Sequence, residues 1–194
     1  RTTSSAASDV YKRQLYDSEV RSGNFKKNAN KIETYELYKK EILIAGFGRI
    51  GKNLIKRCLG FDMKVNVFDP YIDESTIKSY GGNKVDNLQT AIKTSDFVSI
   101  HMPLNEKTRN LIDAKILRTM KSNAIIINTA RGGIINEVDL DNALKSKIIY
   151  AAGLDVFEKE PPDSNNPLLK NKNVLLSPHS ATFTNECKSR MSVE

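Results

Sequence analysis

The sequence predicts an α/β fold in which a doubly wound parallel sheet of about seven strands carries helices on both faces. Three observations support this prediction. Short apolar runs alternate with amphipathic stretches from Glu41 onward, which is typical of strands that alternate with helices. Some runs, such as residues 124–127 (AIII), are apolar enough to be buried on both sides. A glycine-rich turn directly follows the first apolar run and precedes a helical stretch.

The elements follow one another in a regular order. Strands are expected at residues 42–45, 64–68, around 85, 97–100, 124–127, 151–156 and 174–176. Helices are expected at residues 53–59, 74–80, 88–93, from 113 to about 120, and 136–145. Asp113 is a plausible cap for the fourth of these helices. Residues 158–173, rich in Pro and Asn, form a long loop, and such loops are often functional.

Length and composition limit the class of protein. The 194 residues suit one ordinary domain, and 39% hydrophobic with 27% charged residues is an average soluble composition. The net charge of +7 could indicate a nucleic-acid partner, but it is unevenly distributed. Residues 1–40 hold nine basic and five acidic side chains, and the remaining residues hold 21 and 18. Because the excess lies mainly outside the predicted fold, it gives no case for nucleic acid.

The chain has no run of about 18 apolar residues, and residues 1–14 lack the apolar core of a signal peptide. We therefore expect a cytoplasmic protein that does not enter a membrane. Two cysteines, Cys58 and Cys187, cannot form a disulfide framework or a metal site by themselves, so we expect reduced thiols and no metal.

The first forty residues differ from the rest of the chain. Residues 1–8 are small and polar, and no apolar periodicity appears before Ile32. Residues 9–14 (DVYKRQ) resemble the translation of a transposon-end adapter, which would make residues 1–14 a non-native tail. A true amino-terminal extension is the competing interpretation.

The glycine turn Gly46-Phe47-Gly48-Arg49-Ile50-Gly51 has the spacing of a dinucleotide-binding turn. Gly46 makes the tight turn, Gly48 lets backbone amides approach a pyrophosphate, and Gly51 lets the helix pack closely on the strand. The second strand ends at Asp69, 21 residues after Gly48, where a carboxylate can accept hydrogen bonds from the adenosine ribose. Since that carboxylate repels a 2′-phosphate, the pattern predicts a Rossmann-type domain that prefers NAD to NADP.

Five segments together resemble the NAD-binding domain of the D-isomer-specific 2-hydroxyacid dehydrogenase family, over about residues 19–194. They are Gly46 to Gly51, HMPL at 101–104 with Thr108, NTARGG at 128–133, GLDVF at 153–157 with Glu160-Pro161, and SPH at 177–179. The resemblance implies hydride transfer between NAD and a D-2-hydroxy acid or its 2-keto acid. The phosphoglycerate, hydroxypyruvate and glyoxylate branches are the most similar, and the sequence does not separate them.

The resemblance also implies roles for individual residues. His179 matches the acid/base histidine, whose ordinary pKa of about 6.5 suits proton transfer. Glu160 matches the carboxylate that orients this histidine and favours its protonated form. Arg131 matches the group that binds the substrate carboxylate, because a guanidinium can grip it with two hydrogen bonds. Asp155 matches the residue that bonds the nicotinamide carboxamide. Each residue also has a purely structural alternative. His179 could be a hydrogen-bonded structural histidine, Glu160 a solvated loop acid, Arg131 a surface arginine and Asp155 a buried strand cap.

The remaining cofactor contacts are implied by position. His101 belongs to a loop that lines the cofactor, so we expect it not to be the proton carrier. Together with the glycines, Asp69 and Asp155, the expected cofactor-binding residues are Arg49, Ile50, His101, Pro103, Thr108, Thr129, Ala130, Arg131 and His179.

The domain boundaries follow from the same resemblance. We expect the end of an inter-domain crossing helix and a linker at residues 15–40, the Rossmann domain at 41–180, and the start of a return helix at 181–194. The family's substrate domain is missing, so the chain resembles a truncated product of a protein that forms a homodimer. An NAD(H)-sensing, corepressor-like binding module and an inactive NAD-binding fragment are the alternatives to an enzyme.

Overall fold

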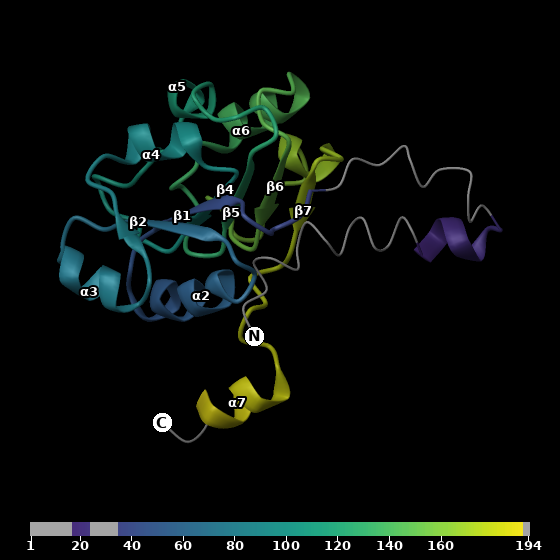
Figure 1. Cartoon of the computed structure of the whole chain (residues 1–194). Helices are drawn as coiled ribbons and strands as arrows, with labels where there is room; N and C mark the ends of the chain where they lie inside the picture. The colour runs from purple at the N-terminus through teal and green to yellow at the C-terminus, as the bar shows by residue number, and fades with distance from the viewer. Residues whose placement is uncertain (1–16, 24–34, 192–194) are drawn as a thin grey trace.

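Seven parallel strands form one sheet in the computed structural model, which describes residues 17–23 and 35–191 (Figure 1). The strand order is β3-β2-β1-β4-β5-β6-β7. The chain therefore crosses from one half of the sheet to the other between β3 and β4, and β1 and β4 lie side by side at the switch point. The predicted fold class is confirmed. The expectations for residues 1–16, 24–34 and 192–194 lie outside the described residues.

The strands and helices alternate as predicted. The strands are β1 (Glu41–Ala45), β2 (Lys64–Phe68), β3 (Asn83–Lys84), β4 (Phe97–Ile100), β5 (Ile125–Asn128), β6 (Ala151–Leu154) and β7 (Val174–Leu176). The helices are α2 (Arg49–Leu59), α3 (Glu74–Ser79), α4 (Leu88–Thr94), α5 (Ala114–Leu117), α6 (Glu137–Lys145), the 3-10 helix η1 (Pro167–Lys170) and α7 (Asn185–Met191). Residues 17–21 are also helical.

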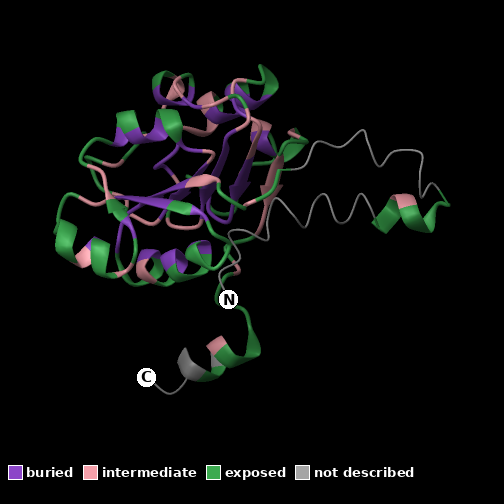
Figure 2. Ribbon diagram, in the orientation of Figure 1, coloured by how far each residue is buried: buried purple, intermediate pink, exposed green. Residues whose placement is uncertain are grey.

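Helices cover both faces of the sheet. In Figure 1, α2 and α3 lie below the sheet and α4, α5 and α6 lie above it. Successive residues of β1 point to opposite faces, so Leu43 belongs to the core under α4, α5 and α6, and Ile44 to the core over α2 and α3. Figure 2 shows the central strands buried, β7 half-buried and the outer faces of the helices exposed. The buried central strands leave their carboxyl ends as the place where side chains can meet a ligand.

Several boundaries differ from the prediction: α2 begins at Arg49 instead of residue 53, β5 is shifted by one residue, and β6 ends at Leu154 instead of residue 156. The third strand comprises Asn83–Lys84 instead of Val85, whose amide still donates to Val67 O. The helix capped by Asp113 has its predicted cap, a hydrogen bond from the Ile116 amide, but ends at Leu117. The loop at residues 158–173 contains η1, which begins at Pro167.

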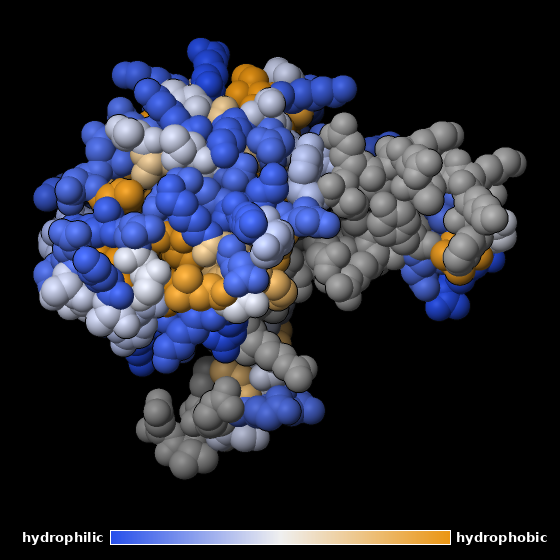
Figure 3. Space-filling view, in the orientation of Figure 1, coloured by the Kyte–Doolittle hydropathy of each residue, from blue (hydrophilic) through white to orange (hydrophobic). Residues whose placement is uncertain are grey.

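A largely hydrophilic surface covers the viewed face, with an apolar patch between α2 and the sheet (Figure 3). A pocket between α2 and the sheet is lined by Leu54, Cys58 and Phe97, among others. Burial raises the pKa of the Cys58 thiol to about 11, so this thiol is protonated and unreactive near pH 7. None of the described helices is long and apolar enough to cross a membrane.

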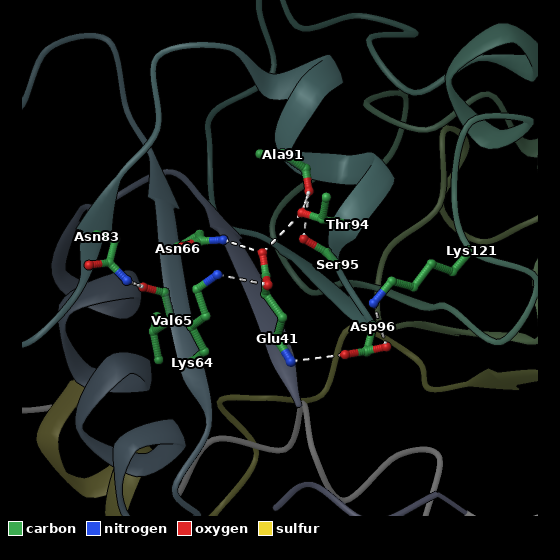
Figure 4. A network of polar contacts seen from close by, with 10 residues as sticks. All are labelled: Glu41, Lys64, Val65, Asn66, Asn83, Ala91, Thr94, Ser95, Asp96 and Lys121. Atoms are coloured by element: carbon green, nitrogen blue, oxygen red, sulfur yellow. Dashed lines mark hydrogen bonds and ion pairs between the residues drawn. The ribbon is translucent and has the colours of Figure 1, made fainter. Parts of the chain in front are cut away.

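Polar side chains join the amino ends of the strands (Figure 4). The Glu41 carboxylate accepts hydrogen bonds from Lys64, Asn66 and Thr94. The Glu41 amide donates to Asp96 Oδ2 at 2.9 Å, and Lys121 Nζ lies 2.9 Å from Asp96 Oδ1. This network ties the first residue of β1 to β2 and to the segment that precedes β4.

Replacing Asp96 by asparagine is expected to lower the free energy of unfolding at pH 7 by about 1–2 kcal/mol. Burial alone would raise the pKa of Asp96, but the Glu41 amide and the Lys121 ammonium outweigh burial and hold this pKa below its ordinary value. The carboxylate therefore stabilises the fold above its unfolded pKa of about 3.9, and this contribution is lost as the pH falls through the lower folded pKa.

Urea denaturation at pH 7 and at about pH 3 measures this difference. The gap between the wild type and Asp96→Asn should be smaller at the acidic pH, and an equal gap at both would contradict the assignment. Asp86→Asn is the matched control, because the Asp86 side chain is 92% exposed in its pair with Lys84. Such an exposed pair is expected to contribute little.

Candidate functional site

The glycine turn after β1 leaves no room for side chains at two positions. Gly46 has φ +100°, and a Cβ there would lie 2.7 Å from the backbone of His101. A Cβ on Gly51 would lie 2.4 Å from the Gly46 carbonyl oxygen. At Gly48, by contrast, a Cβ would meet nothing within 4 Å. Gly46 and Gly51 therefore shape the turn, and Gly48 faces open space.

The amino end of α2 begins at this turn. Its cap residue, Gly48, offers no side chain to the free amides, and the first turn of α2 contains no acidic residue. Arg49 and Ile50 are the first two helical residues, and Ile50 is 53% exposed. Free amides and the positive end of the helix dipole together favour an anion over Gly48.

Asp69, one residue beyond β2, is fixed against the glycine turn. Its Oδ2 accepts a hydrogen bond from the Phe47 amide at 2.8 Å, and its Oδ1 accepts one from the Tyr71 amide at 2.9 Å. Each carboxylate oxygen can still accept a further bond. The predicted ribose contact thus lies at the edge of the anion site.

His101 follows β4 and lies half-buried beside the glycine turn. Its amide donates to Ala45 O at 2.7 Å, and its Nε2 lies 2.8 Å from Ser99 Oγ. Burial lowers the pKa of His101 to about 4, so the imidazole is neutral near pH 7. Such a histidine is poorly suited to donating a proton to a substrate.

The loop after His101 is closed by Thr108. The Thr108 hydroxyl donates to Pro103 O at 2.7 Å and accepts from the Asn105 amide at 2.8 Å. The Thr108 hydroxyl is thus engaged within the loop. Its hydrogen bonds fix the position of Pro103.

The turn after β5 carries Arg131. Asn128, which is 2% exposed, accepts from the Ala130 amide at 3.0 Å and donates to Arg131 O at 2.9 Å. This buried side chain folds residues 129–131 into a turn. The Arg131 guanidinium is exposed and bonds the Ala130 carbonyl at 2.6 Å, so it lies free of the core.

Asp155, directly after β6, has one oxygen paired and one unpaired. Its Oδ1 accepts hydrogen bonds from Ser177 Oγ and from the Ser180 amide. Its Oδ2 is buried and has no hydrogen-bond partner among the described residues. Because an unpaired buried carboxylate oxygen is costly, the site favours a ligand that supplies a donor.

His179 and Glu160 form a pair at the same edge. His179 Nδ1 and Glu160 Oε2 lie 2.8 Å apart, and Glu160 Oε1 accepts from the Phe157 amide at 3.0 Å. The hydrogen bond from His179, then the Phe157 amide and the charges of His179 and Arg131, hold the pKa of Glu160 below its ordinary value. With Nδ1 engaged, His179 has only Nε2 to offer a substrate.

All these groups come from the carboxyl ends of parallel strands, which meet at one edge of the sheet. Sequence reasoning placed the site residues on this edge but missed the residues that hold them. Ser177 was quoted only as part of a motif, and Asn128 likewise. A polar side chain at the end of a buried strand was the available signal for Asn128, and no such signal marks Ser177, which follows the half-buried β7. No group of three metal-binding side chains occurs among the described residues.

Comparisons with known proteins show the family to which this fold belongs. Residues 6–181 match the profile described as the D-isomer specific 2-hydroxyacid dehydrogenase, NAD binding domain. D-3-phosphoglycerate dehydrogenase of Methanocaldococcus jannaschii is 45% identical over 153 residues, which are 79% of this chain and 29% of that protein. Glyoxylate reductase of Korarchaeum cryptofilum is 43% identical over 157 residues, 81% of this chain and 47% of that protein.

Solved structures are similar as well. A glyoxylate reductase from Paecilomyes thermophila matches with a TM-score of 0.83 and 30% identity, over 97% of this chain and 55% of that one. D-lactate dehydrogenase with NAD+ from Lactobacillus jensenii matches with a TM-score of 0.79 and 28% identity, over 95% and 58%. The chain thus spans less than two thirds of the length of each of these proteins.

Proposed function

The chain belongs to the D-isomer-specific 2-hydroxyacid dehydrogenase family as its NAD-binding domain, and on this basis we propose that the complete protein interconverts a D-2-hydroxy acid and its 2-keto acid. We further propose glyoxylate, hydroxypyruvate or phosphohydroxypyruvate as the keto acid, from the names of the similar proteins. The observation that carries the proposal is the His179–Glu160 pair at the edge that also holds the glycine turn.

Two features of the site fit NAD. The open space over Gly48 and the free amides of α2 suit a pyrophosphate. The unpaired Asp155 Oδ2 suits a carboxamide N–H donor. We therefore assign Gly46, Gly48, Arg49, Ile50 and Gly51 to the pyrophosphate end.

The proposed chemistry assigns one task to each side chain. Bound NADH supplies the hydride to C2 of the keto acid. As the carbonyl oxygen gains an electron pair, His179 gives it the proton on Nε2, and Glu160 stabilises the protonated imidazole and fixes its orientation. Arg131 binds the substrate carboxylate through its guanidinium. In the reverse direction His179 accepts the hydroxyl proton.

The Asp69 side chain is proposed to set the preference for NADH over NADPH. Replacing Asp69 by alanine in the complete protein should lower the ratio of kcat/KM for NADH to that for NADPH by about tenfold or more, because a carboxylate that repels a 2′-phosphate and bonds the ribose is lost. Steady-state kinetics with both cofactors measure this ratio.

Asp73→Ala is the matched control for this change. Asp73 lies four residues further along and caps α3 by accepting from the Thr76 amide at 2.7 Å. Its loss should reduce stability and leave the cofactor ratio unchanged. A ratio that stays constant in Asp69→Ala would exclude the ribose contact.

A further inference from the structure

The loop that carries Glu160 is held by an acidic side chain from outside it. Glu137, the first residue of α6, accepts a hydrogen bond from the Glu158 amide at 2.6 Å through Oε1. Its Oε2 accepts another from Asn166 Nδ2 at 2.6 Å. The two bonds grip the loop on either side of Glu160.

Capping of α6 does not require Glu137. The Asn136 side chain caps α6 by accepting from the Asp139 amide. The Asp139 carboxylate is used elsewhere, on the Ala114 amide at 2.8 Å. The Glu137 carboxylate, although well placed for the helix dipole, makes both of its described hydrogen bonds to the loop.

Glu137 bonds the Phe157–Glu158 peptide, on which the turn that carries Arg131 packs. A Cβ on Gly132, next to Arg131, would lie 1.8 Å from Phe157 O and 2.4 Å from Glu158 N. The turn after β5 therefore packs directly on the Phe157–Glu158 peptide. The Phe157 amide in turn donates to Glu160 Oε1. That amide belongs to the preceding peptide, so movement of residues 156–158 would displace Glu160 relative to Arg131.

Two exposed ion pairs of the loop are weaker anchors. The pair between Arg109 and Glu158, at 3.2 Å, is 53% and 52% exposed. The pair between Lys159 and Asp163 is 69% and 57% exposed. Exposed ion pairs contribute about 0–1 kcal/mol, whereas charge-assisted bonds to backbone amides are stronger.

We propose that Glu137 is a positioning residue of the active site, which holds the Phe157–Glu158 peptide so that Glu160 stays aligned with His179. This inference rests on the proposed function, since it assigns Glu160 the role of orienting the acid/base histidine. Glu137 touches neither His179 nor Arg131 in any described hydrogen bond and acts only through the loop.

The test compares Glu137→Ala and Glu137→Gln in the complete protein. Glu137→Ala should lower kcat for keto-acid reduction about tenfold, because small misplacements of catalytic groups are costly. It should also move the acidic limb of the pH profile upward by about 0.5 pH units, since a loosened Phe157 amide no longer lowers the pKa of Glu160 fully. NADH affinity should stay within about twofold. Glu137→Gln, which keeps one acceptor for the Glu158 amide, should give a smaller change in both quantities.

Asp163→Asn is the matched control, because it removes a polar contact of the same loop at the exposed Lys159 pair. It should leave kcat and the pH profile unchanged. If Glu137→Ala fails to fold, Glu137→Gln and its pH profile decide the question. An unshifted acidic limb in both folded variants overturns the inference, provided that Glu160→Gln is impaired. Full activity in Glu160→Gln overturns the proposed function instead.

Discussion

Replacing His179 by alanine in the complete protein is expected to lower kcat for the reduction of glyoxylate or hydroxypyruvate about 1000-fold. Positioned acid catalysis contributes about 10²–10⁴-fold, and His179 is the histidine whose ring is exposed and paired with a carboxylate, at 2.8 Å from Glu160. NADH affinity should change less than twofold, because the anion site over Gly48 lies at the end of another strand. Stopped-flow turnover and fluorescence titration with NADH measure the two quantities separately.

Glu160→Gln is the matched variant for His179→Ala. Glutamine has one acceptor oxygen, so it can keep the hydrogen bond from the Phe157 amide, but it removes the charge and the second acceptor that stabilise a protonated imidazole. We expect an intermediate loss of kcat, about 10- to 100-fold. Turnover close to the wild-type value in His179→Ala would eliminate the proton-transfer role.

His101 offers a second comparison, because it is the other histidine of the chain. Its imidazole is buried against Ser99 and has a pKa of about 4. His101 and His179 therefore lie in opposite environments. One is desolvated and neutral beside the glycine turn, and the other is exposed and carries an anionic partner, which is the environment that an acid/base group requires.

The fold could be predicted because its signals are local. The apolar runs that became β1, β4 and β5 and the predicted cap at Asp113 lie within a few residues of what they determine. The short strand β3 and helix α5 were misplaced by a few residues, since their ends depend on contacts with β2 and with α6. Tertiary contacts of this kind do not appear in local periodicity.

The candidate site divides in the same way. Asp69 was proposed from its place after the second strand, and Asp155 from its match to the family. The side chains that hold them were not, because the partners are distant in sequence. Glu137 meets Glu158 21 residues later, and Asn166 29 residues later. Neither spacing is a motif, so only the folded chain brings these groups together.

Gly48→Ala should weaken NADH binding by about tenfold or more without unfolding the protein. The backbone at Gly48 has φ −75° and ψ −163°, which alanine adopts readily, and a Cβ would meet no atom within 4 Å. Its stability should therefore match that of the wild type within about 1 kcal/mol. A methyl group would nevertheless occupy the open space where the pyrophosphate must approach the amides of α2.

Variants at two further glycines distinguish a loss of NADH binding from a loss of stability. Gly60→Ala, at the opposite end of α2, has φ −65°, and its Cβ would lie 3.3 Å from the Arg57 carbonyl oxygen, a tight contact, so stability should fall slightly and NADH affinity should not. Gly46→Ala combines φ +100° with a contact of 2.7 Å to the His101 backbone, so it should lose both. Thermal denaturation and NADH titration of the three variants resolve these outcomes. Unchanged affinity in a folded Gly48→Ala would mean that the cofactor does not pass over this turn, which would also remove the basis for assigning Asp69 to its ribose.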